Sequence, residues 1–373
     1  ENVTTLVYVI TGTSKMAGFV SFGMLGFVGT VFFVKAACIA VPGLATRRYA
    51  ALCVLAPSLV YWPSSIGKDA IMLLTLGIAT YGIARLVSER AVLGPMLVTS
   101  AGLAGAAYIR PHLVGLWLAG AFPALLIALF RGRGTSPGEQ PRPLERAVFI
   151  PVVAAATIGL VLVSLATVRY LNPNADDSLN DASITDILDE TTRRTEQANS
   201  SFDPPSIDNP VMWPYASIRT LTRPLPFEVR GSAQLFTSLE LTLFLALCVA
   251  SRRRLMNIPR LLINNAYVAF ALTTLFLGGL AFTSFANLGI LARQRSIVFP
   301  FLLLLVCLPP LPRRAPHEPE RASPEFEPRQ KSSMSPSVNA QLASGGTPAS
   351  FTDRHVRIGP PPGNGTHDDG FWD

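Results

Sequence analysis

The chain has 373 residues, of which only 15% are charged, 49% are hydrophobic and the formal net charge is +7. A mean hydropathy of +0.38 excludes an ordinary soluble domain and indicates repeated membrane spans. The basic charge does not indicate a nucleic-acid partner, because most arginines lie in short segments beside apolar runs. The four cysteines lack the spacing of a zinc site or a disulfide framework, so neither a metal nor a cofactor is predicted.

Apolar runs about as long as a hydrocarbon core of about 30 Å predict an all-α polytopic transmembrane bundle of about nine spans. The chain opens on Glu1 without a basic n-region or signal peptide, so we expect a fragment that lacks upstream spans. Gly23, Gly26 and Gly29 in the first run predict close helix packing. The second and fourth runs are short. The nine predicted spans lie at 16–34, 49–62, 68–87, 94–109, 113–130, 147–168, 233–250, 263–283 and 296–311.

Lysine and arginine predict the orientation of these spans. One set of short connections is crowded with basic residues, among them Arg47, Arg85 and Arg252. Such crowding marks the cytoplasmic side, so we expect a multi-pass plasma-membrane protein that starts outside and has a cytoplasmic C-terminus. The opposite connections hold only five basic residues, namely Lys15, Lys68, Arg110, Arg293 and Arg295.

The predicted chain consists of two membrane parts and two segments outside the membrane, which are 169–232 and 312–373. Residues 1–168 form an N-terminal bundle of about six spans, and 169–232 form one large extracytoplasmic loop that is too long to be a mere connection. Residues 233–311 form a hairpin and a last span. The segment 312–373 is rich in Pro, Ser and Gly, and we expect a disordered cytoplasmic tail.

Four polar clusters end up on the predicted outer side. They are Ser64, Ser65, Lys68 and Asp69, then Arg110-Pro111-His112, then Arg219, Arg223, Glu228 and Arg230 leading into Glu240, and finally Arg293-Gln294-Arg295. Their arginines suit an anion such as a pyrophosphate, because guanidinium groups match phosphate oxygens in pairs of hydrogen bonds. A nearby general base would activate a hydroxyl nucleophile, and the candidates are Asp69, His112 and Glu228, which the sequence does not rank. A divalent ion at Asp69 stays open. The candidate substrate-binding residues are Lys68, Arg110, Arg223, Glu240, Arg293 and Arg295.

Simpler interpretations exist for most of these clusters. Lys68 and Asp69 could anchor a span at the interface, Arg110 with His112 could end a helix, and the last arginines could contact lipid phosphates. Glu240 is different, because it lies well inside an apolar span, where an unpaired carboxylate costs about 2–3 kcal/mol. We therefore expect it to have a positive or donor partner. The expected partners are Arg219, Arg223, Arg230 and Arg295.

The segment from Pro57 to Asp69, followed by Arg110-Pro111-His112, resembles polytopic surface-polysaccharide proteins of bacteria, notably actinobacteria. The resemblance covers roughly residues 50–305 and extends through Arg223–Glu228 with Glu240. It includes Arg293-Gln294-Arg295 leading into Pro300. Such proteins are similar to O-antigen-polymerase-like and GT-C-type lipid-linked-sugar glycosyltransferases. The resemblance implies an undecaprenyl-pyrophosphate-linked glycan on the outer face, with Arg110, Arg293 and Arg295 near the pyrophosphate.

One departure concerns the GT-C type, which places a catalytic acid in its first external loop. Residues 1–15 contain only Glu1, which favours the polymerase-like interpretation unless upstream sequence is missing. We expect an enzyme that transfers or polymerises lipid-linked saccharide for a cell-envelope polysaccharide. The alternatives are a transporter or flippase of lipid-linked glycans, or a non-catalytic partner of other cell-envelope assembly proteins. In each case the expected partners are membrane lipid and a polyprenyl-linked saccharide.

Overall fold

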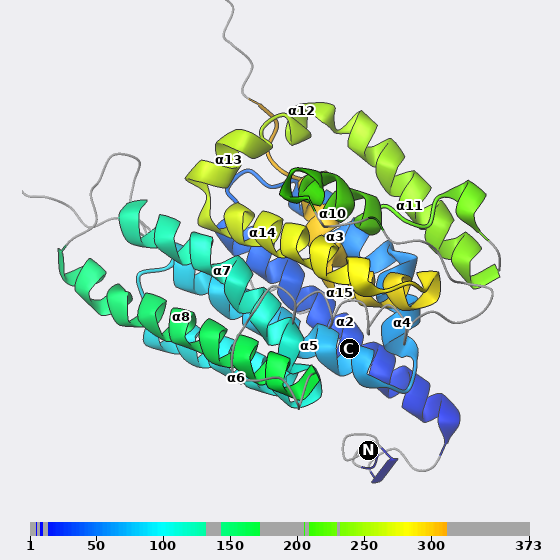
Figure 1. Ribbon diagram of the computed structural model, residues 1–373, viewed down its shortest axis with the longest axis horizontal. Coiled ribbons are helices and arrows are strands. Elements are labelled where there is room, and N and C mark those ends of the chain that lie inside the picture. Colours follow the sequence, from blue (N-terminus) through cyan, green and yellow to red (C-terminus); the bar gives the residue numbers. More distant parts are fainter. Residues whose placement is uncertain are drawn as a thin grey trace, which may run out of the picture. The chain divides into compact units, whose positions relative to one another are not determined.

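The described part of the chain is helical and contains no β-strand, which confirms the predicted all-α class (Figure 1). The predicted tail at 312–373 and the first part of the predicted loop, 172–204, lie outside the described residues. So does Arg230. The computed structural model describes residues 14–131, 143–171, 209–229 and 232–311, with isolated positions at 5, 8, 9 and 205.

Five helices are long and apolar enough to cross a membrane, as expected of a multi-pass membrane protein. A sixth crossing results if α11 (Ser232–Ala250) and the bent segment after it form one span. The five long helices are α2 (Lys15–Ala40), α5 (Lys68–Ser88), α7 (Pro111–Arg131), α14 (Ala266–Ala281) with η3 (Phe282–Ser284), and α15 (Leu288–Leu305).

The predicted count of nine includes segments that the structure divides or shortens. The span predicted at 49–62 consists of two helices, α3 (Thr46–Leu55) and α4 (Pro57–Ser64). The break falls at Ala56, because a residue before proline avoids the helical conformation and proline itself suits a helix start. α6 (Leu93–Ile109) has 17 residues, and the apolar part of α8 (Pro143–Leu171) is short. The nine-span topology therefore stays a prediction.

The last helix differs most from the prediction. It begins at Leu288 rather than at 296, because the Asn287 side chain accepts a hydrogen bond from the Gly289 amide at 2.9 Å and caps it. Arg293 and Arg295 therefore lie inside a helix and not on a connection before it. Asn265 caps α14 in the same way. The remaining short elements are η1 (Pro210–Met212), α10 (Trp213–Leu221), η2 (Pro226–Glu228), α12 (Arg252–Leu255) and α13 (Ile258–Asn264).

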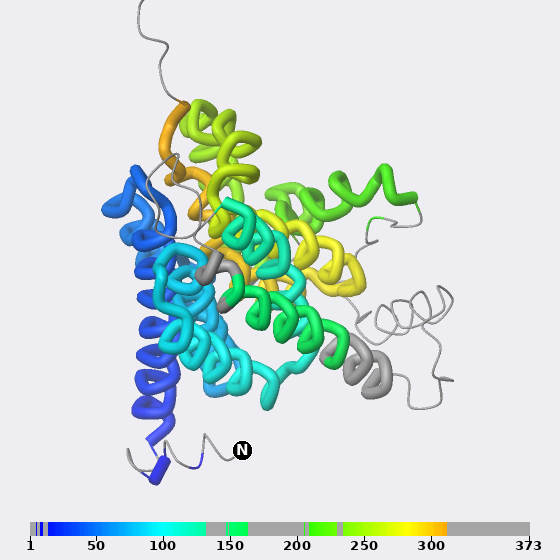
Figure 2. The backbone as a smooth tube through the Cα atoms, turned by 90° about the vertical axis from the view of Figure 1, so that its left-hand side faces the viewer, coloured from blue at the N-terminus to red at the C-terminus, as the bar shows by residue number. Residues whose placement is uncertain are grey.

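Glycines bring α2 and α5 into close contact, which confirms the packing predicted from the glycine series. A Cβ atom on Gly29 would lie 2.5 Å from the carbonyl oxygen of Leu73, and one on Gly77 would lie 2.5 Å from the carbonyl oxygen of Gly29. No side chain larger than hydrogen fits at that separation. Figure 2 shows α2 as the long helix at the margin of the described helices.

α15 is the most deeply buried of the five long helices. The ring of Phe301 contacts Phe33 of α2, Trp117 of α7 and Phe270 of α14, with ring centroids 5.4, 5.9 and 5.3 Å apart. Edge-on and tilted arrangements of this kind stabilise aromatic packing. The C-terminal half of α15 is thus at the centre of the hydrophobic core.

Hydrogen bonds join several helix ends near the C-terminus of α15. Arg48 donates to the Ser251 hydroxyl at 2.8 Å, and Arg254 donates to the carbonyl oxygen of Cys307 at 3.3 Å. Both arginines belong to the set that the sequence assigns to the cytoplasm. Arg293, from the opposite set, lies near the other end of α15, so the two sets occupy different ends of this helix.

Candidate functional site

Two arginines from separate elements meet on one buried aspartate. Asp69 lies in the first turn of α5, where the helix dipole favours a carboxylate, and its side chain is 1% exposed. Arg293 of α15 donates from Nε to Oδ2, and the Nη2 atom of Arg110 lies 3.5 Å from Oδ1. Three residues chosen from the sequence are therefore brought together, and Asp69 with these two arginines is called the Asp69 cluster below.

Arg110 is held at the junction of two helices. It ends α6, because Pro111 follows and begins α7. Its Nη1 atom donates to the side-chain oxygen of Gln294 at 2.6 Å. Burial lowers the pKa of the Arg110 guanidinium, the Asp69 carboxylate opposes this shift, and Arg293 adds to it. Arginine keeps its charge despite such a shift, so the group remains a cation.

Arg293 is the accessible member of the Asp69 cluster. Its side chain is 39% exposed, and its two Nη groups have no hydrogen-bond partner among the described residues. Nη2 lies over Gly67, where a Cβ atom would be 3.5 Å away. Lys68 is exposed beside it. One carboxylate is thus paired with two guanidinium groups, and the exposed Lys68 adds a third positive charge next to it in the sequence, so the excess positive charge favours an anionic ligand.

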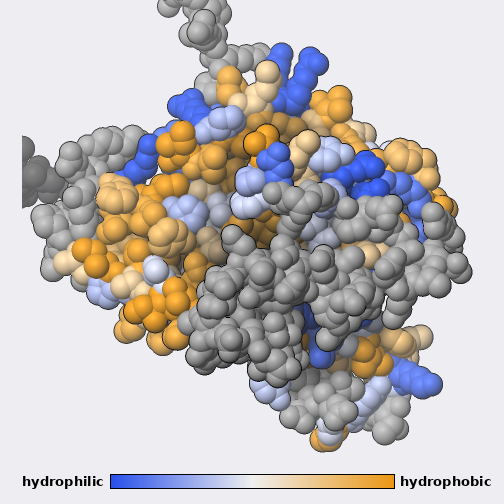
Figure 3. Space-filling model, in the orientation of Figure 1, coloured by the Kyte–Doolittle hydropathy of each residue, from blue (hydrophilic) through white to orange (hydrophobic). Residues whose placement is uncertain are grey.

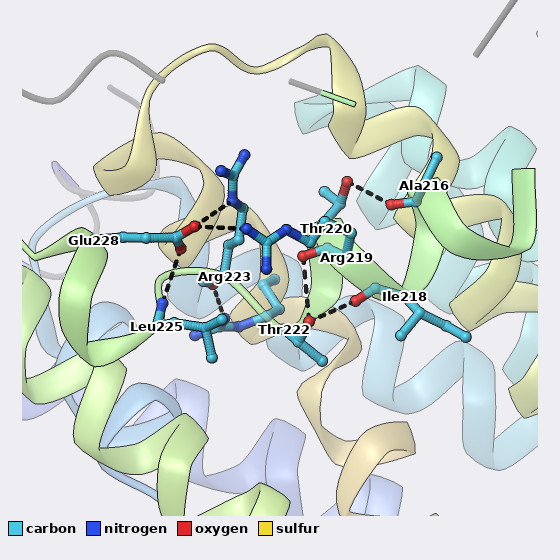
Figure 4. A network of polar contacts seen from close by, with 9 residues as sticks. Ala216, Ile218, Arg219, Thr220, Thr222, Arg223, Leu225 and Glu228 are labelled. Atoms are coloured by element: carbon cyan, nitrogen blue, oxygen red, sulfur yellow. Dashed lines mark hydrogen bonds and ion pairs between the residues drawn. The ribbon is translucent and has the colours of Figure 1, made fainter. Parts of the chain in front are cut away.

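A second group of ion pairs surrounds Glu228 (Figure 4). The carboxylate accepts from Arg219 at 2.9 Å and from Arg223 at 3.0 Å, both on Oε1, and Oε2 accepts from the Leu225 amide at 2.9 Å. Three donors from the same short stretch of chain thus converge on this one carboxylate. Glu228 therefore fixes the turn after α10 and orients two arginines.

Arg295 is fully buried, which differs from the predicted place at a span end. Because α15 starts early, the side chain lies in the interior. There its Nη1 atom donates to the carbonyl oxygens of Arg223 and, at 3.4 Å, of Leu221. The guanidinium also lies over the ring of Phe299, 5.8 Å from its centroid. Arg295 therefore closes the C-terminal end of α10, and its contact with a substrate stays a prediction.

Glu240 has a donor partner, as predicted, but the residue is Ser58. The carboxylate accepts from the Ser58 amide at 3.0 Å and from the Ser58 hydroxyl. Ser58 is the second residue of α4, so its amide has no partner within the helix. Glu240 thus caps a helix that begins inside a predicted span. Arg219 and Arg223, two of the expected partners, pair with Glu228 instead, and Arg295 contributes only an electrostatic attraction.

His112 lies apart from these ion pairs. It is exposed in the first turn of α7, two residues after Arg110, and no described residue hydrogen-bonds it. The sequence did not indicate the part played by Gln294 or by Ser58, since neither residue is charged. The only signal for Ser58 was the proline before it, which marks a helix start.

An apolar cavity of about 340 Å³ lies between α5, α6, α7 and α8. Ala107 and Val114 line it close to Arg110, whereas Leu86 and Leu125 line it toward the opposite ends of their helices. Its walls are almost wholly hydrophobic. The cavity therefore extends along α7 from the neighbourhood of the Asp69 cluster into the depth of the bundle.

Within the described ranges, no three His, Cys, Asp or Glu side chains are grouped so that they could hold a metal ion. No protein-family model, curated protein or solved structure matches this chain. The function is therefore argued from the geometry of the side chains.

Proposed function

We propose that the protein is a membrane enzyme that transfers or polymerises saccharide from a polyprenyl-pyrophosphate carrier at the Asp69 cluster. The observation that carries this proposal is the meeting of Arg110 and Arg293 on one buried carboxylate. It fixes two guanidinium groups beside an accessible surface and leaves the fork of Arg293 free. A leaving pyrophosphate needs fixed positive charge of this kind.

The residues have different roles in this reaction. An acceptor hydroxyl attacks the anomeric carbon of the carrier-linked sugar, a glycosidic bond forms, and the bond to the pyrophosphate breaks. The electron pair leaves with the pyrophosphate, where Arg110 and Arg293 stabilise the charge. His112 takes the proton of the hydroxyl, because its imidazole is exposed in the first turn of α7, two residues after Arg110. Asp69 positions the two arginines.

The apolar cavity supports a lipid-linked substrate. It begins one helical turn from Arg110 on both sides of the α6–α7 junction and is lined by Ala107 and Val114 there. A hydrocarbon chain is the part of a carrier that such walls accept. The headgroup of the same molecule would then lie beside the Asp69 cluster.

The finer topology belongs to the same proposal. The bundle has nine spans in the plasma membrane, the Asp69 cluster faces the extracytoplasmic side, and the C-terminus is cytoplasmic. The support is the crowding of basic residues at the other end of α15. The product would be a cell-envelope polysaccharide, and other envelope assembly proteins would work beside the enzyme.

Binding of farnesyl pyrophosphate to the purified full chain in detergent tests the site directly. Arg110→Lys and Arg293→Lys keep the charge but lose the planar fork, so each should weaken binding by about tenfold or more. Arg85→Lys is the matched control, because Arg85 pairs with Glu89 at 2.9 Å at the other end of α5. Farnesyl monophosphate should bind more weakly than the pyrophosphate to the parent chain.

A cellular assay tests the reaction. Surface-glycan chain length should fall in cells that express Arg110→Lys, Arg293→Lys or His112→Ala, and should not change with Arg85→Lys at equal expression. Unchanged glycan length in all of these variants, together with unchanged farnesyl pyrophosphate binding, would contradict the enzyme proposal and favour an assembly partner.

A transporter of lipid-linked glycan is the second candidate, and the broken helix favours it. Transporters often bind their cargo at discontinuous helices, and α4 begins inside a predicted span with Glu240 at its first turn. In proteoliposomes, Glu240→Gln should slow the crossing of a fluorescent polyprenyl-linked sugar if this candidate is correct. An enzyme without transport activity would show no crossing in either form.

A further inference from the structure

The segment after α11 turns sharply and is fixed on its inner side. The helices before and after Ser251 are bent by 74°. Asn257 donates from Nδ2 to the carbonyl oxygen of Pro309 at 3.0 Å, and Arg254 donates to Cys307. Arg48 of α3 reaches Ser251 at the bend itself. These contacts hold one side of α12 and α13 against the end of α15.

The outer side of the same segment is exposed and has an unusual composition. Arg252 and Met256 lie one turn apart, joined by a hydrogen bond from the Met256 amide to the Arg252 carbonyl oxygen, and Arg260 and Ile263 lie one turn apart in α13. Met256 is 70% exposed and Ile263 is 59% exposed. We call the exposed residues Arg252, Arg253, Met256, Arg260 and Ile263 the elbow patch. Figure 3 shows hydrophilic and apolar residues side by side at the upper edge, where α12 and α13 lie.

The positive charge of the elbow patch is not neutralised nearby in the sequence. Between Glu240 and Glu318 the chain contains no aspartate or glutamate. Arg252, Arg253 and Arg260 form no ion pair with a described residue. Three uncompensated arginines therefore stand beside two exposed apolar side chains, directly after the apolar helix α11.

We propose that the elbow patch binds the anionic headgroups of phospholipids on its face of the membrane. Arginines attract the phosphates, while Met256 and Ile263 enter the boundary between headgroups and acyl chains. Mixed basic and apolar faces at the end of a membrane helix suit this layer. A soluble acidic partner would satisfy the arginines alone. The proposal does not depend on the reaction at the Asp69 cluster, which lies at the other end of α15.

Native mass spectrometry of the full chain in detergent tests the proposal, with phosphatidylglycerol and phosphatidylcholine of identical acyl chains as probes. Each basic residue near an anionic surface contributes about fivefold in affinity, so Arg252→Gln with Arg253→Gln should weaken phosphatidylglycerol binding about 25-fold. Lys15→Gln with Lys35→Gln removes the same charge from exposed positions of α2 and should change it less than about threefold. Phosphatidylcholine binding should be unchanged in both variants.

Two further variants separate charge from depth. Arg252→Lys with Arg253→Lys should keep most of the phosphatidylglycerol affinity, because attraction to a charged surface needs charge more than a planar fork. The fluorescence that Met256→Trp adds to the parent chain should be quenched by phospholipids brominated near the headgroup. Equal phosphatidylglycerol binding in the glutamine variant and its control would overturn the proposal. Absence of quenching of the added tryptophan fluorescence by the brominated phospholipids would overturn it as well. If a soluble acidic protein changed this fluorescence and the phospholipids did not, a protein partner would be favoured.

Discussion

Removing the charge of Asp69 should destabilise the bundle strongly. Asp69 is 1% exposed, whereas Arg110 and Arg293 are 16% and 39% exposed. Asp69→Asn leaves two guanidinium groups near each other without their common anion. Loss of one partner of a buried ion pair costs about 3–5 kcal/mol, and the exposure of Arg293 puts this case near the lower value, about 3 kcal/mol.

A double-mutant cycle shows whether this value comes from the ion pair. Arg293→Gln should cost less than Asp69→Asn, because Arg110 still faces the carboxylate. The double variant should cost less than the sum, with a coupling free energy of about 1–2 kcal/mol. The measurement is unfolding of the purified protein in detergent by added sodium dodecyl sulfate, followed by tryptophan fluorescence. A change below about 1 kcal/mol for Asp69→Asn, or strict additivity, would refute the reasoning.

Three further predictions concern the packing and the capping contacts. Gly29→Ala should destabilise by about 2 kcal/mol because its Cβ has no room beside α5, whereas Gly94→Ala, with nothing within 4 Å, should be neutral or slightly stabilising; unfolding in detergent compares them. Glu240→Leu should destabilise by about 2 kcal/mol, since the Ser58 amide then lacks an acceptor, and Glu240→Gln should lose less; equal losses would argue against the cap. Trp117→Phe should lower the free energy of unfolding by about 1 kcal/mol, because the indole no longer donates its 2.9 Å hydrogen bond to the buried hydroxyl of Thr80. The same assay measures this, and an unchanged value would mean that the hydrogen bond contributes nothing.

The positions of most apolar helices were predictable from the sequence, because membrane spans must be apolar over their whole length. Their interruptions were harder to place. The proline at 57 indicated a helix start, but nothing local showed that the chain would break there and leave an amide for Glu240. The two residues are 182 positions apart, and pairing at such distance depends on how the helices pack.

The site was predicted in part. The sequence predicts Asp69, Arg110 and Arg293 near helix ends on the same side of the membrane. In the structure the three side chains meet. Arg295 was misplaced, since a polar run at the edge of an apolar segment does not reveal that an asparagine cap starts the helix earlier. Two residues of helix, a little more than half a turn, then separate an accessible arginine from a buried one.

Three consecutive side chains of α15 contact three different parts of the chain. Arg293 contacts α5, Gln294 contacts the residue that ends α6, and Arg295 contacts the residues that end α10. α15 follows every other described helix, so the ribosome makes it after them. Until α15 inserts, Asp69 and Arg110 have no partner from it, and the nascent bundle carries incompletely paired charges at the membrane. Chains that stop before α15 should therefore be substrates for membrane proteases, because the charges of Asp69 and Arg110 stay incompletely paired in them.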